Sequence, residues 1–118
     1  MRTIEMYDNV PHGSTLEVRL TPTDGPFTGN VLFTTSGDVP DATWPDADIR
    51  PGPKQQVLQQ GKAYMAEIHL AFMGDATATI AAQIRKQNGN LFSTPKVWEV
   101  AGTNGDTELR VLIIRTAA

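Results

Sequence analysis

Hydrophobic and polar residues alternate strictly in one early segment of the chain. Between residues 15 and 20 the sequence reads Thr-Leu-Glu-Val-Arg-Leu, so apolar residues share one face of an extended chain and Glu17 and Arg19 share the other. A period of two is typical of a β-strand that buries one face. The segment therefore predicts a half-buried strand with two charged side chains directed outward.

Similar signals recur toward both ends of the chain. β-Branched and aromatic residues gather in short runs, as in strands. One run, Val111–Ile114, is apolar at every position, which is typical of a central strand covered on both faces. Asn88-Gly89 has the composition of a tight turn, and Thr103–Asp106 is interpreted as a hairpin. The strands predicted from these signals lie at 4–6, 30–35, 96–100 and 108–115.

Residues 57–85 admit two interpretations. Alternation in 63–72 and 76–85 predicts two strands, whereas the apolar spacing also fits a helical period and the composition suits a helix. Gly61 would interrupt the first helix, and Gly74-Asp75 leaves room for a hairpin or a sharp break. These two features favour strands. The alternative is an α+β fold with helices in 54–73 and 76–87.

Together the segments predict an all-β protein, an antiparallel β-sandwich of the immunoglobulin-like or jelly-roll-like kind with about seven or eight strands. The 118 residues are a usual length for one domain, and 40% of them are hydrophobic. A domain of this size buries enough surface to fold without metals or crosslinks. Residues 1–118 are therefore expected to form a single compact, soluble domain.

Proline, aspartate and glycine interrupt this pattern between residues 36 and 53. Turn-forming residues dominate the segment, which predicts a long loop. Loops of this length in compact domains are usually either functional or disordered. Trp44 lies in the middle of the segment, and a side chain of that size favours partial ordering.

Charge and composition exclude several classes of protein. The ten Lys and Arg residues are spread along a chain of net charge −3, so no basic surface for nucleic acid is expected. The chain has no cysteine for thiol chemistry, and no apolar run approaches the ~20 residues of a membrane span. The N-terminal residues do not resemble a signal peptide, so a cytoplasmic location is the default expectation. No cofactor is predicted.

Catalytic and metal-binding patterns are weak. The chain has two histidines, His12 and His69, and neither has a second ligand-type residue at helical spacing. No serine lies in a nucleophile elbow; the three are Ser14, Ser36 and Ser93. Glu67 and His69, both outward on the predicted strand, are an acid–base pair for a remote alternative, a small hydrolase or isomerase. No catalytic residue is assigned, and the chain is not expected to be an enzyme.

Four carboxylates lie close together in the 36–53 segment, and calcium prefers oxygen ligands on loops. Their spacing is not that of a helix–loop–helix calcium site, and no glycine follows the last of them. Aspartate beside proline is also common for local reasons, because its side chain caps turns. Turn capping is therefore the favoured interpretation of the four weak calcium candidates, Asp38, Asp41, Asp46 and Asp48.

Aromatic residues give the remaining candidates for recognition. Exposed tryptophans beside polar residues hold sugars in sandwich modules and form hot spots at protein interfaces. The ligand-binding hypothesis names Trp44, Trp98, Asp41, Asp46 and Asp48. A place in the core is the favoured interpretation of Trp98, and a lid over one end of the core is an equal alternative for Trp44. The leading functional prediction is a non-catalytic binding or assembly module that acts through loop and edge-strand contacts on a protein partner or on itself. The alternative is a small carbohydrate-binding module or lectin.

Overall fold

The computed structural model describes residues 2–35, 42–50 and 53–117. These residues form nine strands and one short helical turn. The strands are β1 (Arg2–Val10), β2 (Thr15–Asp24), β3 (Phe27–Thr35), β4 (Ala42–Trp44), β5 (Lys54–Val57), β6 (Ala63–Phe72), β7 (Ala76–Arg85), β8 (Lys96–Gly102) and β9 (Thr107–Thr116), and the helix is α1 (Asp46–Ile49).

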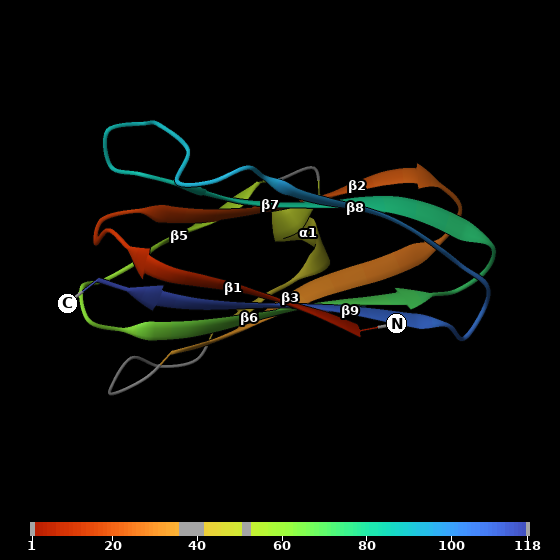
Figure 1. The fold of residues 1–118 in the computed structure, drawn as a ribbon. Helices are drawn as coiled ribbons and strands as arrows, with labels where there is room; N and C mark the ends of the chain where they lie inside the picture. The colour runs from red at the N-terminus through yellow and green to blue at the C-terminus, as the bar shows by residue number, and fades with distance from the viewer. Residues whose placement is uncertain (1, 36–41, 51–52, 118) are drawn as a thin grey trace.

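The strands form two sheets that pack face to face (Figure 1). One sheet has five strands in the order β1-β9-β6-β3-β4, and the other has four in the order β5-β2-β7-β8. Neighbours pair antiparallel, with one exception: β1 runs parallel to β9. The prediction of an all-β sandwich is confirmed, with nine strands in place of seven or eight and one parallel pair at the edge.

Residues 57–85 contain strands, so the alternative with helices in 54–73 and 76–87 is wrong. In β6 every second side chain from Tyr64 to Phe72 is buried, and in β7 every second one from Ala76 to Ile84. A helix would have buried one stripe of each segment, whereas an extended chain places all of these apolar residues in the core. Glu67 and His69 face outward, as the alternation predicts.

Two expected hairpins are wrong. β6 and β7 belong to different sheets, and so do β8 and β9, so residues 73–75 and 103–106 carry the chain across the sandwich. Both connections are tight, as their Gly and Asp content indicates: Gly105, at φ +92°, lies in the second one. A turn signal predicts a reversal of direction but does not distinguish pairing within a sheet from stacking between sheets.

The expected 36–53 loop is in part regular structure. β4 pairs with β3, and α1 follows it directly. Ile49 of α1 is buried in the core between the sheets. α1 therefore closes the side of the sandwich where β4 and β5 are the edge strands. No helix in the described residues is long and apolar enough to cross a membrane.

Candidate functional site

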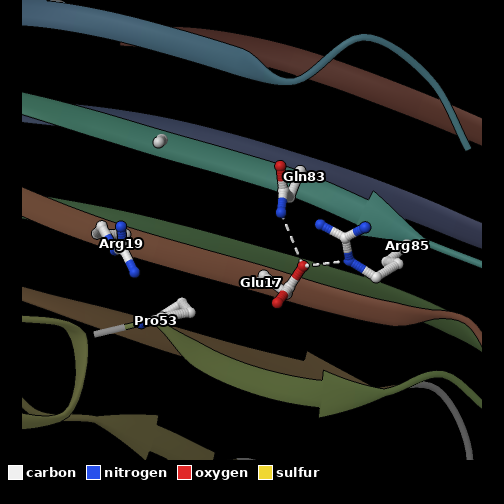
Figure 2. A pocket seen from close by; sticks show the side chains of 6 residues that line it. Glu17, Arg19, Pro53, Gln83 and Arg85 are labelled. Atoms are coloured by element: carbon white, nitrogen blue, oxygen red, sulfur yellow. Dashed lines mark hydrogen bonds and ion pairs between the residues drawn. The ribbon is translucent and has the colours of Figure 1, made fainter. Parts of the chain in front are cut away.

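A polar depression lies on the outer face of the four-stranded sheet (Figure 2). Its volume is about 310 Å³, and we call it the Glu17 depression after the carboxylate at its floor. Sheet register assembles it, because Glu17 on β2 lies opposite Gln55 of β5 on one side and Gln83 of β7 on the other. The residues that line it are Glu17, Arg19, Pro53, Ala81, Gln83 and Arg85.

Three side chains donate hydrogen bonds to the buried Glu17 carboxylate. Gln55 Nε2 lies 2.6 Å from Oε2, Gln83 Nε2 2.8 Å from Oε1, and Arg85 Nε 3.2 Å from the same Oε1. Arg85 is itself held by the Gly89 carbonyl oxygen, which accepts a hydrogen bond from Nη1 at 2.7 Å. Glu17, with three donors, and Arg85, with two acceptors, are thus held in place by hydrogen bonds within this sheet and the turn after β7.

The net effect of this environment is a lowered pKa for Glu17. Burial alone raises the pKa, but the hydrogen bonds from Gln83, Gln55 and Arg85 together with the Arg85 charge outweigh burial. The carboxylate is therefore ionised at neutral pH and is a poor general base. Arg19 lies exposed beside it and forms no ion pair with the described residues. The depression is equipped to bind polar groups, by accepting hydrogen bonds at Glu17 and donating them from Arg19.

Trp44 lies in the core. It is 3% exposed and stacks on Phe33 with the ring centroids 5.4 Å apart, so it offers almost no ring surface to a ligand. Asp46, two residues later, holds structure together: its Oδ1 accepts hydrogen bonds from the Gly29 amide at 2.8 Å and from Arg50 Nη2 at 2.6 Å. The structure therefore does not bring Trp44 and Asp46 together as a binding surface.

The other candidates from the 36–53 segment give less information. Asp38 and Asp41 lie outside the described residues. Asp48 belongs to α1, but its side chain is outside the description. In the part of the chain that the structure describes, no three His, Asp or Glu side chains gather closely enough to hold a metal ion. The calcium hypothesis stays a prediction.

Trp98 is partly buried against the core on the opposite side of the sandwich from Trp44. The Arg110 guanidinium lies 5.9 Å from the centre of its ring, and Arg110 Nη1 is 2.9 Å from Glu108 Oε2. Trp98 is thus part of a cluster that seals the gap between β8 and β9. The two tryptophans named in the binding hypothesis do not share a site.

The Glu67–His69 pair exists, with Oε2 and Nε2 3.3 Å apart on the outer face of the five-stranded sheet. His69 and Asp46 both line one shallow depression of about 410 Å³. Threonine, glycine, asparagine, proline, leucine and alanine complete its lining, and no serine or cysteine is among them. Glu67 is not part of this lining, and the only hydroxyl groups in it are those of Thr28, Thr43 and Thr107. The hydrolase or isomerase alternative stays a prediction.

The free edges of the two sheets differ in length. On the side that α1 closes, the edge strands β4 and β5 have three and four residues. On the other side the edge strands β1 and β8 have nine and seven residues. The Glu5 carboxylate of β1 and the Lys96 ammonium of β8 are 3.5 Å apart, which shows that these two edges lie next to each other. We call this surface the β1/β8 side.

Large apolar side chains are exposed on both strands of the β1/β8 side, from the outer face of the five-stranded sheet on β1 and from the outer face of the four-stranded sheet on β8. Ile4 and Met6 of β1 are 49% and 55% exposed, and Val97 of β8 is 59% exposed. A groove of about 390 Å³ is lined by residues 5–8 of β1 and by Phe92, Ser93, Thr94 and Lys96. The β1 edge thus combines an edge strand with two exposed apolar side chains, Ile4 and Met6.

The comparisons with known proteins add no relative. The chain matches no family model. Searches of curated proteins and of solved structures also give no match. The site must therefore be judged on its geometry.

Sequence patterns predicted neither the Glu17 depression nor the β1/β8 side as a site. Alternation did place Glu17 and Arg19 outward, but Gln83 and Arg85, which bind Glu17, lie more than sixty positions away from it in sequence. That pairing becomes visible with the register of β2 against β7. Ile4 and Met6 indicated a strand, and an edge position cannot be inferred from a single strand's composition.

Proposed function

We propose that the protein is a non-catalytic binding or assembly module whose contact surface is the β1/β8 side. The observation that carries the proposal is the asymmetry of the edges: both long edge strands, with Ile4, Met6 and Val97 exposed on them, lie on the same side of the sandwich. Exposed long edges are pairing surfaces unless they are shortened or covered. A polypeptide that adds a strand there would satisfy the free backbone groups and cover apolar surface.

The other side of the sandwich supports this choice by contrast. Its edge strands are short, and α1 packs between the sheets with Ile49 buried. Short edges and a covering helix are ordinary protections against unwanted pairing. The loop contacts expected from 36–53 rest in part on residues outside the description, so the proposal relies on the edge strands.

The test is a comparison of matched charge substitutions. Ile4→Lys with Met6→Lys places two charges on β1, and Val57→Lys places one on the opposite edge strand β5, where Val57 is 56% exposed. Each variant and the wild type are used to capture partners in host cells, and binding of the purified partner is then titrated. The proposal expects the β1 variant to lose binding and the Val57 variant to keep it. Equal retention by both variants would contradict it.

A small carbohydrate is the second candidate ligand, and the Glu17 depression is the observation that favours it. Planar polar side chains such as Glu, Gln and Arg hold the hydroxyl groups of sugars by hydrogen bonds, and Glu17 is fixed by its three donors. The test is a titration with a panel of glycans in which the NMR chemical shifts of the backbone amides around Glu17 and Arg19 are measured. Shifts elsewhere, or none across the panel, would remove it.

A further inference from the structure

We infer that the partner of β1 is a second copy of this chain, paired antiparallel across a two-fold axis at Glu5. The inference rests on the proposed function, because it names the occupant of the β1 edge. Such pairing would join two five-stranded sheets into one sheet of ten, an isologous interface in which each copy uses the same surface. The argument comes from the register that β1 can adopt against itself.

Symmetry limits that register. An axis perpendicular to the sheet keeps outer faces with outer faces, so each residue must lie opposite one that points to the same face. With the axis at Glu5, Ile4 of one copy lies opposite Met6 of the other, and Thr3 lies opposite Tyr7. The two exposed apolar side chains then cover each other on both sides of the axis, which is a favourable cross-strand pair.

The position of the axis decides what the apolar side chains of β1 meet. With the axis at Glu5, Asp8 lies beyond the Ile4–Met6 pair at each end of the pairing, and its carboxylate is 3.8 Å from Arg115 Nη1 of its own copy. Moving the axis to Met6 would set Ile4 opposite Asp8, an apolar side chain against a carboxylate. Moving it to Ile4 would leave Met6 opposite Arg2. Of these three axes, the one at Glu5 is the one that sets the two apolar side chains opposite each other.

The two Glu5 residues would meet at the axis, and like charges in that position oppose pairing. A charge that points inward on an edge strand is also a known protection against pairing. Here each Glu5 carboxylate lies 3.5 Å from Lys96 of its own copy. The four charges at the axis sum to zero, so Lys96 is what makes the edge compatible with a second copy.

Cysteine crosslinking tests the register directly, because the chain contains no cysteine. Directly opposed residues of an antiparallel pair have Cα atoms about 4.5–5.5 Å apart, within the range of a disulfide. Ile4→Cys and Met6→Cys are therefore prepared separately as full-length proteins and mixed. We expect the mixture to form a disulfide-linked dimer under mild oxidation at least about ten times faster than either variant alone. Val57→Cys, equally exposed on β5, measures crosslinking by random collision.

Three other outcomes would overturn the inference. Crosslinking of Ile4→Cys with itself as fast as in the mixture would place the axis at Ile4. Crosslinking of Met6→Cys with itself would place it at Met6. A mixture that crosslinks no faster than Val57→Cys would show that a second copy does not add to β1. In that last case the proposed function is still tested separately by the comparison of the lysine variants. If the partner is a different polypeptide, the Ile4→Lys, Met6→Lys protein should no longer bind it.

The charges at the axis give a second, independent measurement. Lys96→Met leaves the two Glu5 carboxylates opposed, and we expect the dimer dissociation constant to rise about 1.4- to 5-fold, which is the effect of a cross-strand charge pair. Glu5→Gln in the Lys96→Met background removes the repulsion and should restore it. Analytical ultracentrifugation measures both values. An unchanged dissociation constant in Lys96→Met would contradict the role of Lys96.

Discussion

Glu17→Gln is the sharpest test of the Glu17 depression, because it changes charge with little change of shape. Glu17 is buried and accepts hydrogen bonds from Gln55, Gln83 and Arg85. A glutamine offers one acceptor oxygen and turns an NH₂ group toward donors. Hydrogen bonds to a charged group contribute roughly 1.5–3 kcal/mol each, and the half-exposed Arg85 contributes less because water screens it. We expect a loss of about 2–3 kcal/mol in the free energy of unfolding at pH 7.

The pH dependence of this stability difference shows whether the charge of Glu17 causes it. The folded pKa of Glu17 is lowered, so ionised Glu17 stabilises the fold fully above its unfolded pKa, and this stability is lost as the pH falls through the folded pKa. Urea unfolding should therefore show a constant difference between wild type and Glu17→Gln at neutral pH, which shrinks below about pH 4.3. Glu99→Gln, an exposed carboxylate on β8 of the same sheet, is the control and should stay near zero. A difference below about 0.5 kcal/mol at pH 7, or one that does not shrink as the pH falls below about 4.3, would refute the reasoning.

Three further predictions concern the core and the turns. Trp44→Ala removes a buried ring and should cost about 3–5 kcal/mol in urea unfolding; a loss below 1 kcal/mol would contradict its burial. Gly25→Ala and Gly61→Ala both place an alanine at a positive φ, which strains the backbone. The new Cβ overlaps a backbone carbonyl oxygen at Gly25 and meets open space at Gly61. Thermal unfolding should therefore show a far larger loss of stability for Gly25→Ala than for Gly61→Ala. Hydrogen bonds from the Thr103 amide and hydroxyl lower the pKa of Asp106, so its NMR titration midpoint should lie below 3.8 and rise in Thr103→Val.

Local patterns predicted the strands well because burial of one face imposes a period of two. The central position of β9 also followed from its apolar run, since it lies between β1 and β6 with Val111, Leu112 and Ile114 buried. The short strands β4 and β5 escaped prediction because three or four residues hold too little of a period. Their pairing with β3 and β2 is a property of the assembled sheets.

Long-range pairing explains what the sequence left open. The parallel register of β1 with β9 joins residues more than a hundred positions apart, and nothing in Arg2–Val10 alone specifies that partner. The Glu17 depression depends in the same way on β2 lying between β5 and β7. The polar neighbours of Trp44 leave an exposed ring and a lid over the core equally open, whereas contact with Phe33 and the core determines where its ring lies. Candidate sites on this protein therefore follow from sheet order more than from local composition.

Association through the β1 edge is tested most directly by the mass in solution of three proteins: wild type, Ile4→Lys with Met6→Lys, and Val57→Lys. Light scattering coupled to gel filtration, over a tenfold range of concentration, measures that mass against the 12.8 kDa of one chain. The account predicts a mass of about two chains for the wild type and for Val57→Lys, and of one chain for the β1 variant. A single mass shared by all three proteins would contradict it.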